Sequence, residues 1–186
     1  MQPDEYTNFL ILTLSYHNFN LIRDLNNVIT SEKDNKIKDL YYAWCEYVGS
    51  PRISPMHAGS VWMITAAVLL TAKTWLNIFP NEKRYDLSED WGLLHADIKC
   101  SKHGDNPPLH TIVRRSRNAI AHGRIEYQGS NIGSGTLKQG YMIFRDIDKK
   151  TNSTFYMKIT LFDLSRFQSK IYEQLREDSR FSRFYK

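Results

Sequence analysis

The sequence contains little cysteine: only Cys45 and Cys100 carry thiols among its 186 residues. A secreted protein of this size more often contains a denser, even set of cysteines, because disulfides form and persist outside the cell. We therefore expect a protein of a reducing compartment, the cytoplasm.

Long hydrophobic runs and a targeting segment are also missing. The longest apolar stretch, residues 61–72, is interrupted by Thr65 and Thr71 and followed by Lys73, so it is too short to span a bilayer. The N-terminal residues MQPDEYTNF place no basic group ahead of an apolar run, as a signal peptide would. These absences predict a protein that is neither secreted nor inserted in a membrane.

Acidic residues are scarce in the second half of the chain. Residues 94–186 contain 17 Lys and Arg against 9 Asp and Glu, whereas residues 1–93 contain 8 against 11. A basic half favours a polyanionic partner, because cationic side chains that bind phosphates release counterions and steer the encounter. A solvated basic surface without a partner explains the same charge equally well.

Hydrophobic periodicity predicts helices over most of the chain. Apolar residues recur at steps of three and four, and glycine or proline follows several of these stretches. The fourth helix is expected to start at Ser88, with Glu89 and Asp90 in its first turn. The predicted helices cover residues 5–29, 34–48, 57–79, 88–99 and 109–123.

The pattern changes after Gly123. The segments RIEYQ, LKQGYMIFRDI and TFYMKITL alternate as strands do, with a turn at residues 148–153, and Asp163 is expected to cap a last helix. The predicted fold is therefore mainly α: an up-and-down helical bundle of about five to six helices with a small antiparallel β-hairpin before the last helix. One domain is expected over residues 1–186.

The side chains best suited to catalysis or binding lie near the end of the predicted helix 109–123. At 100° per residue, one side of this helix is apolar or small and is expected to face the bundle. The opposite side carries Arg114, Arg117, Asn118, Ala121 and His122. The small Ala121 leaves room for another surface to approach this cationic face.

Arg117 and His122 are five residues apart, which is about 7.5 Å along the helix axis and about 140° around it. This spacing is too wide for a local pair on one helix. Two copies that cross about a two-fold axis would bring both pairs to one cleft. The spacing therefore favours a homodimer formed through the Arg117–His122 helix.

The sequence RNAIAH, from Arg117 to His122, resembles the R-x4-6-H signature of the HEPN superfamily. The context is similar as well: several helices precede the motif, and short strands and a closing helix follow it. The resemblance implies an endoribonuclease that uses neither a metal ion nor a cofactor. It also implies a toxin-like protein that acts in cell defence or growth arrest.

The resemblance assigns the catalytic roles to Arg117, Asn118 and His122. His122 would transfer the proton when the RNA 2′-hydroxyl attacks the adjacent phosphorus, since imidazole exchanges protons near neutral pH. Arg117 would stabilise the phosphate charge, and Asn118 would orient either group. The RNA backbone would be bound by the neighbouring arginines Arg114, Arg115 and Arg124.

The sequence allows more than one function and more than one kind of partner. The family analogy implies RNA as the substrate and an antitoxin or nucleotidyltransferase-like protein as a possible partner. Alternatively, the chain is a non-catalytic HEPN module that binds RNA or a nucleotide, or a helical module that docks an acidic protein. The loop around residues 99–109 contains Cys100, His103, Asp105 and His110, but without paired CxxC spacing a polar loop is the better interpretation than a zinc site.

Overall fold

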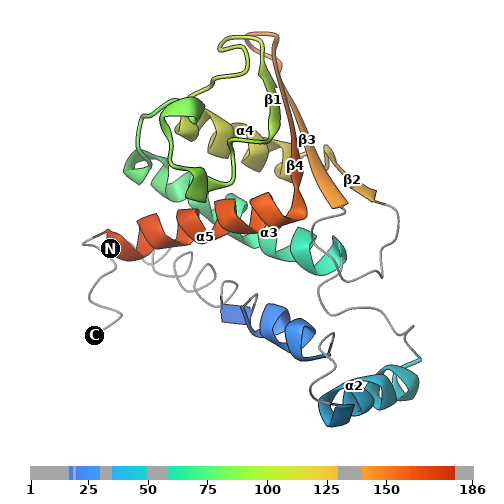
Figure 1. Cartoon of the computed structure of the whole chain (residues 1–186). Coiled ribbons are helices and arrows are strands. Elements are labelled where there is room, and N and C mark those ends of the chain that lie inside the picture. The colour runs from blue at the N-terminus through green and yellow to red at the C-terminus, as the bar shows by residue number, and fades with distance from the viewer. Residues whose placement is uncertain (1–16, 19, 30–34, 50–57, 130–139, 179–186) are drawn as a thin grey trace.

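A computed structural model of the chain describes residues 17–18, 20–29, 35–49, 58–129 and 140–178. Residues 20–29 are helical, and α2 follows at Asn35–Tyr47. Residues 20–29 pack against the hydrophobic core through Ile22, whereas α2 lies apart from the sheet and the other labelled helices in Figure 1. No helix in the described ranges is long and apolar enough to cross a membrane.

A four-stranded antiparallel sheet forms one layer of the described part of the chain. Its strand order is β1-β4-β3-β2, and the long β3 and β4 pair in its centre from Tyr141 opposite Thr160 to Asp148 opposite Ser153. The strands are β1 (Asp97–Cys100), β2 (Ile125–Gly129), β3 (Gly140–Asp148) and β4 (Ser153–Thr160).

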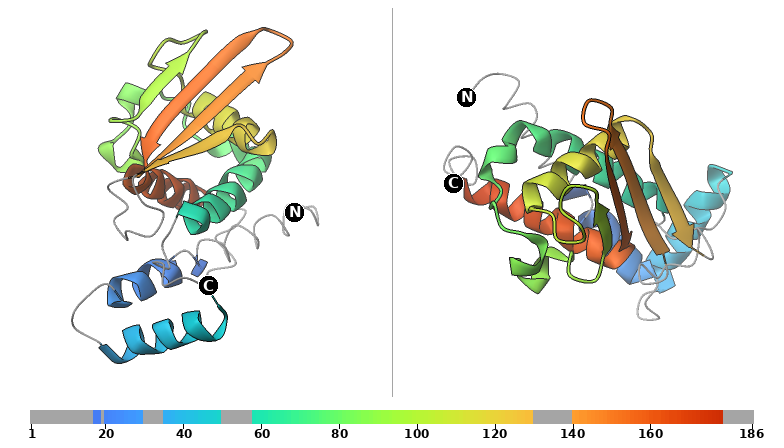
Figure 2. Two further views of the ribbon diagram at one scale, coloured as in Figure 1. Left: turned by 90° about the vertical axis from the view of Figure 1, so that its right-hand side faces the viewer. Right: turned by 90° about the horizontal axis from the view of Figure 1, so that it is seen from above.

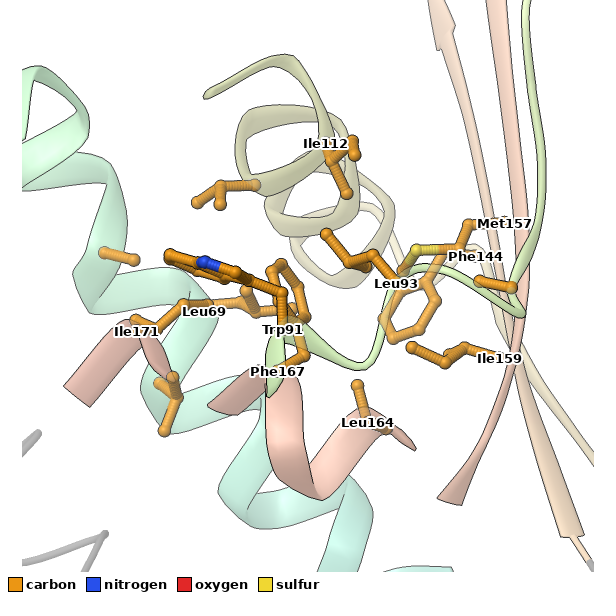
Figure 3. Packing of buried hydrophobic residues seen from close by; sticks show 14 of the residues in the cluster. Leu69, Trp91, Leu93, Ile112, Phe144, Met157, Ile159, Leu164, Phe167 and Ile171 are labelled. Carbon is orange, nitrogen blue, oxygen red and sulfur yellow. The ribbon is translucent and has the colours of Figure 1, made fainter. Parts of the chain in front are cut away.

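Helices α4 (Leu109–Ala121) and α5 (Leu161–Glu177) pack on one face of this sheet, and α3 (Ala58–Ala72) packs against these two helices. Figure 1 shows the sheet almost edge-on, with the helices on one side of it. Alternate strand residues point toward these helices, since side chains alternate between the two faces of a strand. Phe144 of β3, Met157 of β4 and Phe167 of α5 are fully or almost fully buried there (Figure 3).

The expectation of a mainly helical bundle with a single small hairpin is wrong. The structure is an α+β arrangement in which four strands form a sheet against the helices. The three segments that alternate in the sequence do form β2, β3 and β4, as predicted. The additional strand, β1, comes from a segment that we predicted to be helical.

The predicted helix at residues 88–99 is replaced by a single 3₁₀ turn and β1. The turn, Glu89–Trp91, ends at Gly92, which has φ +65°, and Ser88 makes no side-chain cap. A Cβ at Gly92 would collide with the backbone carbonyl of Asp163, so this position requires glycine. The chain then extends into β1, which pairs with β4. A strand of four residues is too short for hydrophobic alternation to predict it.

Helix α4 begins at the predicted residue and ends at Ala121, two residues before the predicted end at Gly123. It starts at Leu109, directly after Pro108, and Gly123 follows it with φ +63°. The Gly123 N–H donates to the Ile120 carbonyl and the Arg124 N–H donates to the Ala119 carbonyl, which is the Schellman pattern of helix termination. This termination leaves His122 at the exposed end of α4 and directs the chain into β2.

Helix α5 is capped by Thr160 instead of Asp163. The Thr160 hydroxyl accepts a hydrogen bond from the Asp163 N–H at 3.0 Å and donates to the Asp163 carboxylate at 2.8 Å. The apolar residues of this helix recur at steps of three and four and are buried, at Leu164, Phe167, Ile171 and Leu175.

Arg84 holds the irregular segment between α3 and α4 together. It is only 5% exposed. Its guanidinium donates hydrogen bonds to four backbone carbonyls, those of Leu93, Leu94, Ala96 and Asp105. These bonds close the loops on either side of β1 around one side chain, because the planar guanidinium presents five donors in fixed directions.

Replacing Arg84 by Met should lower the free energy of unfolding by about 3 kcal/mol or more, because buried carbonyls lose a charged donor. Urea unfolding followed by circular dichroism measures this change. Arg166→Met is the matched control, since Arg166 makes only partly exposed ion pairs and its loss should change little. Equal effects of the two substitutions would contradict this role of Arg84.

Candidate functional site

The two sides of α4 differ as the helical wheel predicts. Leu109, Ile112, Val113 and Ala119 are fully buried against the core. In the described part of the chain, the other side of α4 faces away from the core. Its exposed or half-buried residues are Arg114, Arg117, Asn118, Ala121 and His122. The polar stripe of the RNAIAH segment is therefore open to a ligand or to another protein surface.

A cavity of about 430 Å³ lies between this end of α4 and the β3–β4 hairpin. His122 and Asn118 from the motif line it, and Arg114 and Arg124 flank them on either side along the chain. The sheet side of the lining comes from Asp146, Ile147, Asp148 and Lys149. The cavity collects several cationic groups, and its volume is in the range of small-molecule sites.

Asp146 is the centre of this site. It lies on β3, is 2% exposed, and points inward between the sheet and α4. Its carboxylate is 3.1 Å from Nε of Arg115 and 3.7 Å from Nη1 of Arg124, and it accepts a long hydrogen bond from the Asn118 amide at 3.5 Å. One buried carboxylate therefore contacts three residues around the motif.

Arg115 was expected to bind the RNA backbone, but its side chain is not exposed to solvent. It is 4% exposed, and its guanidinium donates to the Ser153 carbonyl at 2.6 Å and to the Asp146 carbonyl at 3.4 Å. With these bonds and the Asp146 carboxylate, Arg115 ties α4 to both central strands. Arg115 therefore positions α4 and Asp146 at the site, while Arg114 and Arg124 remain accessible.

Arg117 lies beside the cavity without lining it. Its Nη1 donates to the Asn118 side-chain oxygen at 3.1 Å. Its Nε is buried and has no hydrogen-bond partner among the described residues. Asn118 thus stands between Arg117 on one side and Asp146 on the other, which sets the direction of its amide group.

The charge of the cavity is mixed. A hydrogen bond from Thr151 lowers the pKa of the Asp148 carboxyl group, helped by the backbone of Lys150. At the other end of α4, burial and the nearby Arg114 lower the pKa of His110, so this histidine favours the neutral form. The cations at the cavity therefore face one solvent-accessible carboxylate, Asp148, and one buried carboxylate, Asp146.

Sequence reasoning missed Asp146 and Lys149, which lie about 30 residues after the motif. A signal for Asp146 exists: it has the same strand parity as Met142 and Phe144, so it is a charged residue at a core-facing position. Such a residue needs a buried partner, and Arg115 supplies it. Lys149 is in an exposed turn and carries no comparable signal.

The loop with Cys100, His103, Asp105 and His110 gives no metal centre in the described ranges, where no three potential ligands are grouped suitably. Cys100 is the last residue of β1 and is buried in the core, and Tyr85 donates a hydrogen bond to Asp105 at 2.9 Å.

Asp146 and Arg115 should be strongly coupled in stability. Breaking a buried ion pair costs about 3–5 kcal/mol, so Asp146→Asn and Arg115→Met should each destabilise the fold, while the double variant loses much less than the two losses combined. Urea unfolding of the four proteins gives the coupling free energy. The exposed pair Glu126–Arg145, at 2.7 Å, is the control and should show little coupling. Additive losses at Asp146 and Arg115 would contradict the assignment.

A comparison with protein-family models finds a match over residues 60–180, to the family described as HEPN pEK499 p136. Comparisons with curated proteins and with solved structures return no significant match. The matched region runs from α3 to α5 and includes the RNAIAH segment, the cavity and the whole sheet. Because the match covers well over half of the sequence, the chain belongs to the HEPN family.

Proposed function

We propose that this protein is a metal-independent endoribonuclease of the HEPN type. The observation that supports the proposal is the grouping of His122, Asn118, Arg114 and Arg124 around one open cavity, with Arg117 hydrogen-bonded to Asn118. An exposed imidazole beside several guanidinium groups is the set that general acid–base cleavage of a phosphodiester needs.

In the proposed reaction, His122 accepts the proton of the RNA 2′-hydroxyl while O2′ forms a bond to the adjacent phosphorus. The bond between phosphorus and O5′ breaks, and O5′ takes a proton from an imidazolium or from water. The products are a 2′,3′-cyclic phosphate and a 5′-hydroxyl end. Negative charge grows on the phosphate oxygens during this step, and guanidinium groups stabilise it without exchanging protons.

The arginines would act at different points of the substrate. Arg117 would bind the reacting phosphate, with Asn118 holding its guanidinium from one side. Arg124 would contact the same or the next phosphate, because its side chain is 34% exposed while its inner nitrogen stays near Asp146. Arg114 would bind a phosphate further along, since it is exposed at the far side of the cavity.

The catalytic unit in this proposal is a homodimer in which two α4 helices face each other. In one chain, Arg117 lies outside the lining of the cavity that His122 lines. A second α4 packed on the exposed stripe would add its own arginine and histidine to a shared cleft. Ala121 lies on this stripe and is exposed, so it permits close approach of the helices.

In the cell, a nuclease of this kind would act in defence or growth arrest. Its activity would then need control by an antitoxin or by a nucleotidyltransferase-like partner. This part of the proposal rests on the family analogy.

His122→Ala and Arg117→Ala should each slow RNA cleavage at least about 100-fold, since one lacks the general base and the other the phosphate charge partner. Cleavage of a labelled single-stranded RNA on denaturing gels measures the rate. His95→Ala is the matched control, because His95 is exposed but outside the cavity. If both motif variants cleave at the wild-type rate, the catalytic assignment fails; RNA binding without any wild-type cleavage would identify a non-catalytic module instead.

Ala121→Arg should disrupt the dimer and abolish cleavage, because a long cation on the exposed stripe separates the two helices. Sedimentation velocity measures the association state, and circular dichroism checks that the fold is kept. The control Ala43→Arg places the same change on an exposed position of α2. A wild-type protein that cleaves RNA as a monomer would exclude the dimeric site.

A further inference from the structure

The face of the sheet turned away from the helices carries an ordered row of cations and tyrosine. Lys99 of β1 lies opposite Tyr156 of β4, and Tyr156 lies opposite Arg145 of β3. These three residues are direct cross-strand neighbours, and strands in a sheet are spaced about 4.8 Å apart. Figure 2 (left) looks onto this face.

Both cations contact the aromatic ring between them. The Lys99 ammonium is 5.9 Å and the Arg145 guanidinium 5.8 Å from the centroid of the Tyr156 ring. Lower on the same face, the Lys158 ammonium is 4.5 Å from the ring centroid of Tyr141. Each tyrosine is thus accompanied by positive charge, which is the combination that binds stacked bases and their phosphates.

These groups are exposed or half-buried, with Tyr156 and Lys158 in the half-buried class. The side chains of Lys99 and Arg145 are 75% and 50% exposed, and Tyr141 is 38% exposed. In the described part of the chain no helix covers this face, since α3, α4 and α5 all lie on the other side (Figure 1). A hollow of about 620 Å³ opens beside Tyr156 and is lined by Lys99, Arg145 and Thr154.

The hollow and the cavity at the motif are neighbours on either side of β3. Asp146 and Ile147 of β3 line both. Adjacent residues of a strand point to opposite faces, so the chain at these two positions separates the outer hollow from the cavity beside α4. A flexible strand that lies over Tyr156 can pass the exposed Ile147 and continue toward His122.

We propose that the outer face of the sheet binds single-stranded RNA that leads to the cavity at His122. One base stacks on Tyr156 within the hollow, and Lys99 and Arg145 bind the phosphates on either side of it. A second base stacks on Tyr141, about 13 Å further along the strands, with Lys158 beside it. The inference rests on the proposed function for the choice of RNA as the polyanion.

Single-stranded RNA fits this face better than a duplex. The face presents aromatic rings separated by cations, and bases stack on such rings only when they are unpaired. The acidic residues Asp97 and Glu126 lie on the same face but are paired with Lys99 and Arg145, at 3.8 and 2.7 Å. RNA phosphates would take over these cations, so binding should weaken as salt rises.

The test is fluorescence anisotropy with a labelled 12-nucleotide oligouridine, on full-length protein that carries His122→Ala to prevent cleavage. Adding Tyr156→Leu should weaken binding on the order of ten-fold, because one stacked base is lost, whereas Tyr156→Phe should retain it. Tyr47→Leu is the matched control, since Tyr47 is an exposed tyrosine on α2. Lys99→Ser should reduce the salt dependence of the affinity.

Equal affinity of the Tyr156→Leu and Tyr156→Phe proteins would overturn the proposal. So would a change of association state caused by Tyr156→Leu in sedimentation velocity, which would identify the face as a protein contact. The outcome is separable from that of the nuclease proposal. If protein with an intact His122 cleaves RNA and Tyr156→Leu changes neither cleavage nor affinity, the nuclease stands and the binding face is wrong.

Discussion

The buried carboxylate of Asp146 is the interaction on which the site depends. It neutralises Arg115 inside the protein and also lies near Arg124 and the Asn118 amide. A guanidinium as buried as that of Arg115 requires such a partner, because unpaired charge is costly away from water. The pairing joins α4 to the sheet at one point and thereby sets which residues of the basic segment remain outside. Arg115 is buried in this ion pair, whereas Arg114, Arg124 and His122 remain accessible at the cavity.

This constraint connects the fold to the proposed chemistry. The Schellman motif at Gly123 ends α4 just before His122 and returns the chain to the sheet as β2. The β3–β4 hairpin then supplies the opposite wall of the cavity, from Asp146 to Lys149. The imidazole and the arginines are thus presented at a junction of helix and sheet, where an RNA strand approaches from the outer face of the sheet in the account proposed here.

Sequence reasoning succeeded where local signals are strong. Long periodic segments, the proline before α4 and the glycine after it located the helix that carries the motif, and the family resemblance carried by RNAIAH is confirmed by the family match. It failed where the structure is decided by distant contacts. β1 is four residues long and exists through pairing with β4, and Gly92 is required by the backbone near Asp163. The same RNA-binding role was expected for Arg114 and Arg115, but Asp146, 31 residues after Arg115, pairs with Arg115 inside the protein and leaves Arg114 exposed.

The chemical nature of the cleaved ends tests the central claim most directly. A single-stranded RNA incubated with the wild-type protein in excess EDTA, then analysed by mass spectrometry, distinguishes the possible reactions. We predict fragments that end in a 2′,3′-cyclic phosphate and begin with a 5′-hydroxyl, because in the proposed reaction the 2′-oxygen is the nucleophile and no metal is needed. Fragments with a 3′-hydroxyl and a 5′-phosphate, or cleavage that EDTA abolishes, would contradict it.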